Sequence, residues 1–186
     1  MNKARLVELG EQAENEGYHP NPLFPPSLYY RFLKLLARSM KPKLSIELGV
    51  CGGGGSLHLA IGHPKGRVIG VDFQYDHPEH IRYIEMNHSN FEFMLSDSVS
   101  AASKICNEDT KIDILFIDTD HTYERTLKEY EAYRYFMRKG GVICFDDLFR
   151  PGMEEAWDEI PGKKVRLDHL HDGTYPHGGG FGCVIA

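Results

Sequence analysis

The sequence lacks the features of several common protein classes. It has no excess of positive charge, since 21 Lys and Arg stand against 27 Asp and Glu and the formal net charge is −6. Such a balance gives no electrostatic footprint for nucleic acid or an anionic membrane. The sequence also has no apolar run of membrane-spanning length, and its first residues lack the apolar core of a secretion signal. We therefore expect a cytoplasmic protein that binds neither nucleic acid nor membrane.

Zinc-binding motifs are missing as well. The ten histidines and four cysteines include no Cys-x-x-Cys and no His-Glu-x-x-His, although histidines recur closely within 77–80 and 169–171. These spacings alone do not predict a zinc site. Three of the cysteines, Cys51, Cys144 and Cys183, lie in or beside apolar strand patterns. We expect buried free thiols, as is usual in a reducing cytosol.

A glycine-rich turn between a strand and a helix is the most informative feature that is present. A short apolar run carries Glu47 and ends in the stretch GVCGGGGS at 49–56, where a helical pattern begins. Such a turn brings bare backbone and free N–H groups to the polar atoms of a ligand. A second apolar strand pattern ends in Asp72, nineteen residues after Gly53. An acid at this place can accept both hydroxyls of a ribose, so we expect a cofactor that contains a nucleoside.

Two phosphate-binding motifs come close to this stretch but do not fit it. The P-loop pattern matches 49–56 except that Gly55 stands where lysine is required, and the dinucleotide pattern G-x-G-x-x-G is met in no register. Glu47 would repel a pyrophosphate, whereas it suits a ligand with an ammonium or sulfonium group. S-adenosylmethionine has a ribose, no phosphate and such a charge. A glycine turn without a ligand would leave Glu47 and Asp72 at two strand ends unexplained.

Strand and helix patterns alternate along most of the chain. Helices are predicted first at 3–16 and 28–40. Strands are then predicted at 44–48, 67–72, 91–95, 112–117 and 141–146. The helices between and after them are predicted at 56–62, 78–88, 98–106 and 122–138, the last with Thr122 as N-cap. Because the runs within 112–117 and 142–145 are almost continuously apolar, they are expected to be central strands of a doubly wound α/β sheet.

The pattern changes after residue 147. A short helix is predicted around 154–159, and strands near 163–169 and 181–185 lack a long crossover, so they predict an antiparallel hairpin at one sheet edge. The length predicts one domain, 1–186, made of a helical segment, a cofactor- and metal-binding core and a C-terminal helix and hairpin, at 1–42, 43–147 and 148–186. The long loop 171–180 is expected to form a lip of the site.

Acidic residues follow several of the predicted strands, at the sheet edge where open α/β sheets bind ligands. They are Asp72, Asp97, Asp118, Asp120, Asp146 and Asp147. Asp118 and the Asp146-Asp147 pair end consecutive strand patterns, so we expect them to converge. Three carboxylates at one point repel one another unless a cation lies between them, and oxygen ligands suit Mg²⁺, Ca²⁺ or Mn²⁺. The alternative is that each acid caps a following helix.

Between Glu47 and Asp147 the chain resembles a class I S-adenosylmethionine-dependent methyltransferase. The stretch DTDHTYE at 118–124, followed by GG at 140–141 and DD at 146–147, narrows the resemblance. It is similar to the family of small-molecule O-methyltransferases that includes macrocin and rhamnosyl O-methyltransferases and the cephalosporin hydroxylase-like proteins. Catechol O-methyltransferases are more distant relatives. The resemblance implies a Rossmann-like, single-domain, seven-stranded sheet that is mostly parallel with an antiparallel last strand.

The resemblance also implies roles for individual residues, which fall into three groups. The cofactor-binding residues would be Glu47, Gly49 and Gly53 at the methionine end, Gly55 or Ser56 as the loop's serine equivalent, Asp72 at the ribose, Asp97 and Ser98 at the adenine, and Asp118. The ligands of Mg²⁺ or another divalent cation would be Asp118, Asp146 and Asp147. The general base would be His121 or Asp120, and we expect the Asp120 carboxylate to orient the His121 imidazole.

The expected activity is metal-assisted O-methylation of a small hydroxylated molecule such as a sugar or glycoside. The sulfonium is already an activated donor, so the protein must align the acceptor hydroxyl with the methyl carbon and remove its proton. A metal-independent methyltransferase is one alternative, and a non-catalytic S-adenosylmethionine-binding module is another. The expected partner is the small-molecule acceptor, and the sequence leaves open whether the chain forms a homo-oligomer.

Overall fold

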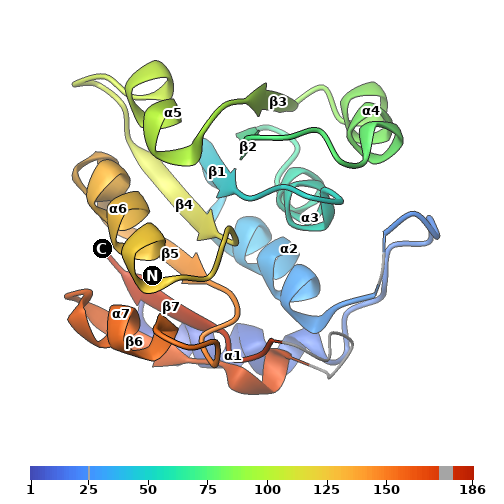
Figure 1. Ribbon diagram of the computed structural model, residues 1–186. Helices are drawn as coiled ribbons and strands as arrows, with labels where there is room; N and C mark the ends of the chain where they lie inside the picture. The colour runs from blue at the N-terminus through green and yellow to red at the C-terminus, as the bar shows by residue number, and fades with distance from the viewer. Residues whose placement is uncertain (25, 172–177) are drawn as a thin grey trace.

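The computed structural model describes residues 1–24, 26–171 and 178–186, and within them seven strands form one sheet (Figure 1). The strands are β1 (Leu44–Leu48), β2 (Arg67–Asp72), β3 (Phe91–Leu95), β4 (Ile112–Ile117), β5 (Met137–Phe145), β6 (Lys163–Arg166) and β7 (Gly182–Ile185). Their order across the sheet is β3-β2-β1-β4-β5-β7-β6. The first five are parallel, and β7 runs antiparallel to both β5 and β6. This is the predicted Rossmann-like α/β fold with an antiparallel C-terminal hairpin.

Helices cover both faces of the sheet (Figure 1). They are α1 (Lys3–Ala13), α2 (Leu28–Met40), α3 (Gly54–Gly62), α4 (Pro78–Asn87), α5 (Ser98–Ile105), α6 (Tyr123–Tyr133) and α7 (Met153–Glu159). Side chains of α1 to α4 belong to one buried cluster, and those of α5 to α7 belong to the other. Two single-turn 3₁₀ segments, Arg134–Phe136 and Asp168–Leu170, complete the described helical structure.

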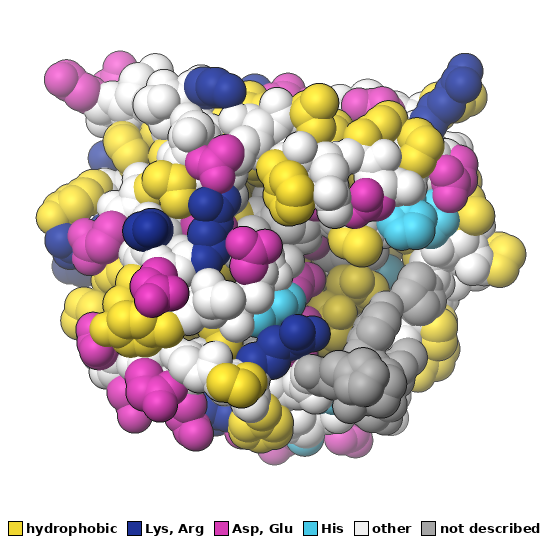
Figure 2. Space-filling model, in the orientation of Figure 1, with side chains coloured by type: hydrophobic (Ala, Val, Ile, Leu, Met, Phe, Trp, Pro, Cys, Tyr) yellow, Lys and Arg dark blue, Asp and Glu magenta, His cyan; other side chains and the backbone are white. Residues whose placement is uncertain are grey.

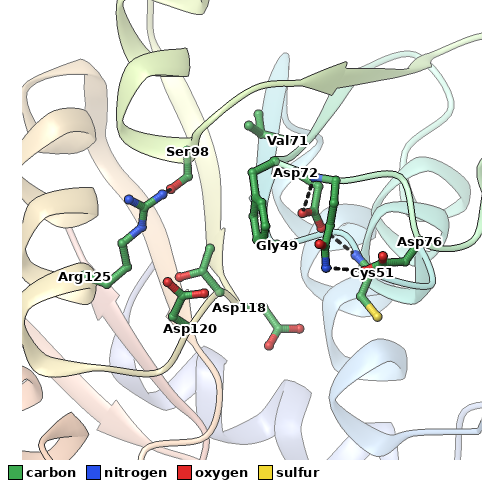
Figure 3. A pocket seen from close by; sticks show the side chains of 12 residues that line it. Gly49, Cys51, Val71, Asp72, Asp76, Ser98, Asp118, Asp120 and Arg125 are labelled. Atoms are coloured by element: carbon green, nitrogen blue, oxygen red, sulfur yellow. Dashed lines mark hydrogen bonds between the residues drawn. The ribbon is translucent and has the colours of Figure 1, made fainter.

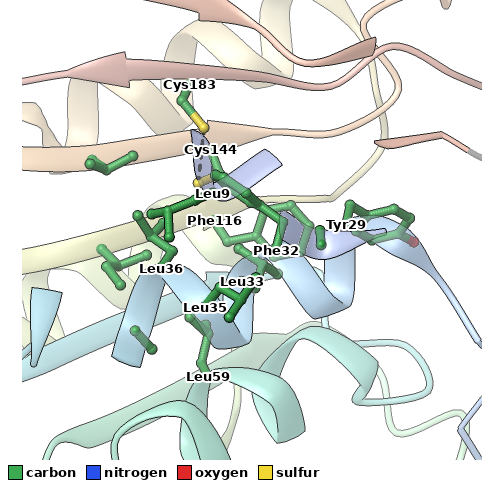
Figure 4. Close-up of a cluster of buried hydrophobic side chains, with 14 of the residues drawn as sticks. Leu9, Tyr29, Phe32, Leu33, Leu35, Leu36, Leu59, Phe116, Cys144 and Cys183 are labelled. Atoms are coloured by element: carbon green, nitrogen blue, oxygen red, sulfur yellow. Dashed lines mark hydrogen bonds between the residues drawn. The ribbon is translucent and has the colours of Figure 1, made fainter. Parts of the chain in front are cut away.

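The apolar run of β4 shows why both faces are needed. Ile114 and Phe116 belong to the cluster under α2, whereas Leu115 and Ile117 belong to the opposite cluster. Successive side chains of a strand point to opposite faces, so a central strand covered on both sides is apolar throughout. Figure 4 shows Phe116 in the buried cluster that also contains Phe32 of α2 and Cys144.

The largest boundary error concerns the predicted helix 122–138. The helix α6 ends at Tyr133, and β5 begins at Met137 instead of residue 141. Long-range pairing explains the change, because the Gly140 N–H donates to Ala186 O and the Ala186 N–H donates to Gly141 O. Residues at the end of the chain thus draw the start of β5 into the sheet. Thr122 is the N-cap residue of α6, although its side chain makes no capping hydrogen bond.

The cysteine prediction is correct for two of the three side chains. Cys144 and Cys183 are buried on neighbouring strands, with their free thiol sulfurs 3.6 Å apart. Cys51 is exposed, so the prediction of a buried thiol is wrong there. It lies not in a strand but in the glycine turn after β1, with a left-handed backbone (φ 44°). Within the described residues no helix has the length and apolar character to cross a membrane.

The predicted lip, 171–180, falls mostly outside the described residues, which exclude 172–177. Its C-terminal end is described and is tied to the segment after β5. The Leu148 N–H donates to Gly180 O at 3.1 Å, and the Phe149 N–H donates to Gly179 O at 2.8 Å. These bonds hold the chain just before β7 against the acids that follow β5.

Candidate functional site

A cavity of about 230 Å³ opens at the carboxyl ends of β1, β2 and β4. The sheet order places β1 between β2 and β4. The chain leads from β1 to β2 and β3 on one side and returns from β3 to β4 on the other, so a crevice remains at the end of β1. Figure 3 shows the lining residues, with Asp72 and Arg125 on opposite sides and Asp118 between them. Figure 2 shows that this face of the molecule is hollowed at its centre, with acidic side chains around the hollow.

The glycine turn lets the end of β1 approach the end of β4. Gly49 has φ 85°, and a Cβ on it would overlap the backbone carbonyl of Asp118. Gly53 has φ 76° as the N-cap residue of α3, and a Cβ there would lie 2.6 Å from a methyl carbon of Ile84. Both positions therefore require glycine for conformation and for space. Gly49 lines the cavity as predicted, whereas Gly53 packs against α4.

Three of the residues predicted to bind the cofactor, Glu47, Gly55 and Ser56, lie behind the turn and do not line the cavity. The Ser56 hydroxyl donates to the Glu47 carboxylate, and both side chains are buried. Gly55 has no room for a Cβ because the Glu47 carboxylate lies directly over it. Burial raises the pKa of Glu47 well above its usual range, and the negative charges of Asp118 and Asp72 raise it further. These residues thus support the turn from beneath.

Asp72, predicted to bind the ribose, is held in place by the glycine turn. Its Oδ2 accepts hydrogen bonds from the backbone N–H groups of Val50 at 2.8 Å and Cys51 at 2.9 Å. From the described residues, its Oδ1 accepts one longer bond, 3.3 Å, from the Gln74 N–H. One oxygen is therefore fixed by the glycine turn, and the other keeps lone-pair capacity for hydroxyl donors in the cavity that Asp72 lines.

On the opposite side, Ser98 lines the cavity and Asp97 does not. Asp97 is the N-cap residue of α5, accepting from the Ser100 N–H at 2.8 Å, and it pairs with Arg125 at 2.6 Å. These hydrogen bonds lower the pKa of Asp97 to about 2. For this acid, the helix-cap alternative describes what the side chain does.

A buried network behind Ser98 was missed from the sequence. The fully buried Glu129 accepts hydrogen bonds from the hydroxyls of Ser98 and Thr119 and from Arg125 Nε at 2.9 Å. It therefore joins the end of β4, the start of α5 and one turn of α6. The sequence signal was the Arg125–Glu129 spacing of four residues, which puts both side chains on one helix face.

The acids after β4 and β5 do converge, with a histidine among them. Asp118, His121 and Asp146 each offer one ligand atom, and these atoms lie within 4.8 Å of one another. The Asp146 Oδ1 atom is buried, and none of the described residues hydrogen-bonds to it. Burial raises the pKa of Asp118 and of Asp146 well above the usual range, and repulsion from neighbouring carboxylates raises both further. A cation would relieve this repulsion and satisfy the unpaired oxygen.

Asp147, the third predicted metal ligand, is engaged elsewhere. Its Oδ1 accepts from the Gly179 N–H at 2.8 Å, and its Oδ2 accepts from Arg150 Nε at 2.7 Å. Its backbone is left-handed, with φ 53°. The converging group that the structure forms from the described residues therefore contains His121 in the place predicted for Asp147. The reason is the contact with Gly179, which lies 32 residues along the chain.

The prediction that Asp120 orients the His121 imidazole is wrong, because the ring contacts other carboxylates. The His121 Nε2 atom lies 3.1 Å from Asp118 Oδ1, and its Nδ1 atom lies 3.7 Å from Asp147 Oδ2. His121 has φ 51°, so the chain turns back at this residue and the ring reaches the end of β4. Burial lowers the pKa of His121, although the neighbouring carboxylates oppose the shift. Asp120 is exposed and lines the cavity.

Comparison with known proteins identifies relatives. A family model described as a methyltransferase domain matches residues 46–148. A Dictyostelium discoideum protein named "Probable caffeoyl-CoA O-methyltransferase 1" is 30% identical over 65% of the chain and 54% of its own length. A flavonoid 3',5'-methyltransferase from Vitis vinifera is 30% identical over 75% of the chain and 64% of its own length. The chain thus spans about half to two thirds of the length of these relatives.

The solved structures support the fold. An O-methyltransferase from Bacillus cereus in complex with SAH superimposes with a TM-score of 0.71, covering 98% of this chain and 90% of that one at 19% identity. The relatives above are named for caffeoyl-CoA and flavonoid substrates, so the resemblance to the macrocin and rhamnosyl group remains a prediction. The matched segment runs from within β1 to beyond β5 and covers more than half of the chain. The chain therefore belongs to the methyltransferase domain family.

Proposed function

We propose that the protein transfers a methyl group from S-adenosylmethionine to a hydroxyl of a small molecule, with help from a divalent cation. The observation that carries the proposal is the state of Asp72, whose Oδ2 is fixed by two N–H groups of the glycine turn while Oδ1 remains available in the cavity. Family membership and the names of the relatives support the same activity. We place the reaction in the cytoplasm.

The charge of the cavity favours this cofactor over a phosphorylated one. Four acids line it: Asp72, Asp76, Asp118 and Asp120. Arg125 is the one cation among the described lining residues, and it already pairs with Asp97 and Glu129. An acidic cavity attracts the sulfonium and ammonium of S-adenosylmethionine and repels a pyrophosphate. In our proposal Asp72 accepts the ribose hydroxyls, Ser98 lies at the adenine and Asp118 lies at the methionine end.

The residues present fit a divalent cation at the ends of β4 and β5. Asp118 and Asp146 would hold it, with His121 as a third ligand or as the base beside it. Carboxylate oxygens suit Mg²⁺, and an added imidazole nitrogen admits Mn²⁺ as well. A bound cation of this kind lowers the pKa of a hydroxyl that it contacts. The unpaired Asp146 Oδ1 is the specific evidence for the fit.

His121 is the candidate for removing the acceptor's proton. Its lowered pKa keeps the imidazole neutral near pH 7, which a base requires. The Asp118 carboxylate at Nε2 and the Asp147 carboxylate near Nδ1 fix the ring and stabilise the charged form once a proton arrives. The remaining task of the cavity is alignment of the hydroxyl with the methyl carbon, which supplies several kcal/mol of the barrier.

Calorimetry on the purified chain tests the cofactor. S-adenosylhomocysteine is expected to bind with a micromolar Kd, and NADH and ATP are expected to bind at least tenfold more weakly because of the acidic cavity. Tighter binding of NADH or ATP would overturn the assignment. Transfer of a labelled methyl group to a panel of catechols, flavonoids, sugars and glycosides then tests the reaction. Tight S-adenosylhomocysteine binding without transfer to any of them would favour a non-catalytic binding module.

A metal-independent methyltransferase is the second candidate, and one observation favours it. Asp147 is held by Gly179 and Arg150, so the oxygen-only ligand set predicted from the sequence is incomplete. His121 between two carboxylates would then act alone as the base. Turnover that is unchanged after chelation with EDTA would select this candidate over the metal-assisted one.

A further inference from the structure

A second cluster of metal-binding side chains lies outside the cavity, at the start of α4. The imidazole rings of His77 and His80 stack with their centroids 4.9 Å apart. Glu79 Oε1 lies 3.5 Å from His80 Nε2 and 3.9 Å from His77 Nδ1. One ligand atom from each of the three side chains lies within 4.8 Å of the others. Figure 2 shows exposed histidine and acidic side chains on the side of the molecule where α4 lies.

The tautomer of His80 is fixed by a backbone partner. His80 Nδ1 lies 3.0 Å from the carbonyl oxygen of Gly52. A carbonyl oxygen only accepts, so Nδ1 carries a hydrogen, and in the neutral tautomer that this selects Nε2 is the metal-binding nitrogen, on the side of Glu79. Metal-binding histidines in proteins usually donate their second N–H to a carboxylate, a backbone carbonyl or water, because such a partner orients the ring and makes the ligand more basic. The ring of Phe24, at a centroid distance of 5.4 Å, packs against His80.

The donor set and its exposure define the kind of ion. Two imidazole nitrogens and one carboxylate oxygen suit zinc and similar borderline cations, whereas Mg²⁺ and Ca²⁺ prefer oxygen alone. Ligand atoms around tetrahedral zinc are about 3.3 Å apart, given bonds of about 2.0–2.1 Å. The observed 3.5 and 3.9 Å need only small side-chain adjustments. The side chains of His77 and Glu79 are 44% and 60% exposed, so an ion can reach them from solvent.

We propose that His77, Glu79 and His80 form a binding site for Zn²⁺ or a related borderline divalent cation, separate from the carboxylate group at the ends of β4 and β5. Solvent would complete the coordination. The histidine spacing alone did not predict zinc, and the folded chain adds the carboxylate and the Gly52 carbonyl to it. The same hydrogen bond ties the site to the glycine turn, because Gly52 directly precedes the N-cap of α3.

Calorimetric titration of the metal-free full chain with Zn²⁺, without any cofactor, tests the site. Co²⁺ absorption provides an independent readout of nitrogen ligation. His77→Ala and His80→Ala are each expected to weaken one Zn²⁺-binding event at least tenfold. Glu79→Gln is expected to weaken it less, because the amide keeps an oxygen donor but loses the charge. His88→Ala, at the other end of α4, is the matched control and is expected to bind as the wild type does.

Asp146→Asn separates this site from the carboxylate group, which also contains a histidine. The Zn²⁺ event that His77→Ala removes is expected to persist in Asp146→Asn. The proposal is overturned if Asp146→Asn abolishes all Zn²⁺ binding, or if both histidine variants bind Zn²⁺ as the wild type does. Circular dichroism of His77→Ala, a change at a half-exposed side chain, verifies that the variant is folded. Since no cofactor is used, failure of the proposed methyl transfer leaves this result unaffected.

Discussion

Asp72 at the end of β2 and Asp146 at the end of β5 occupy equivalent places in the sheet and have opposite surroundings. Two backbone N–H groups donate to Asp72, so the fold itself satisfies its charge. Asp146 has a buried oxygen to which no described residue donates a hydrogen bond. Its burial raises its pKa, and the charge of Asp118 raises it further. The first acid is thus organised to accept hydroxyl groups, and the second needs a cation or a proton. The neighbouring groups alone thus determine whether an aspartate in this position binds hydroxyl groups or a cation.

The largest expected effect tests the chemistry of the cluster formed by Asp118, His121 and Asp146. His121→Asn should lower turnover by roughly two to four orders of magnitude, the usual contribution of a general base. Asparagine is the preferred replacement because it tolerates the left-handed backbone at this position better than alanine does. S-adenosylhomocysteine affinity, measured by calorimetry, should barely change.

Asp120→Asn is the matched control for His121, since Asp120 is exposed and does not contact the imidazole in the expected way. Its effect on turnover should be much smaller. If activity survives in His121→Asn and vanishes in Asp120→Asn, Asp120 is the base and the histidine has another role.

The next largest effect tests Asp72 as a residue that binds the cofactor. Asp72→Asn should weaken S-adenosylhomocysteine at least tenfold, because hydrogen bonds to a charged acceptor contribute about 1.5–3 kcal/mol each. Turnover at saturating cofactor should change less than affinity does. Asp76→Asn is the control: it changes another acid of the cavity that is exposed and therefore screened by solvent. Equal losses in the two variants would mean that the cavity acts through total charge and not through a ribose contact.

A smaller effect concerns stability and metal. Removing the charge in Asp146→Asn should raise the melting temperature of the metal-free protein by about 2–4 °C for each kcal/mol of relieved repulsion. Mg²⁺ or Mn²⁺ should stabilise the wild type, since a ligand that binds only the folded state shifts the unfolding equilibrium. The variant should lose most of this response in a thermal scan. An unchanged metal response in both Asp146→Asn and Asp118→Asn would remove the cation from the proposal.

The smallest expected effect is a difference in pH dependence between two acids. A carboxyl whose pKa is raised by folding stabilises the fold below its unfolded pKa, and that contribution is lost as pH rises through the folded pKa. Asp146 is of this kind. Asp97, with its pKa lowered to about 2, contributes stability above its unfolded pKa of about 4 and loses it as pH falls toward 2.

Melting temperatures of the metal-free wild type, Asp146→Asn and Asp97→Asn across pH measure this difference. Asp146→Asn should flatten the decline of stability on the alkaline side. Asp97→Asn should flatten the decline on the acid side, by a small amount because this carboxylate is largely exposed. Parallel curves for all three proteins would contradict the assigned surroundings of both acids.

The sequence by itself determined the framework of the fold. The predicted strands 44–48, 67–72, 91–95 and 112–117 coincide with β1 to β4, and the place of Asp72 at the end of β2 follows directly. These features depend on local patterns: a strand buried on both faces must be apolar throughout, and a glycine turn marks where it ends. The C-terminal hairpin was also predictable, because the sequence between its strands shows a loop pattern and no long helix of the kind that usually forms a parallel crossover.

Only the tertiary structure decided which side chains meet. Asp147 turns to Gly179, Glu47 is buried against Ser56, and His121 reaches Asp118 instead of its neighbour Asp120. Each outcome depends on a partner brought by folding or on a left-handed backbone angle that the residue types did not predict. Residue patterns report the burial of a chain segment, whereas the direction and partner of a polar side chain are set by the segments that fold against it.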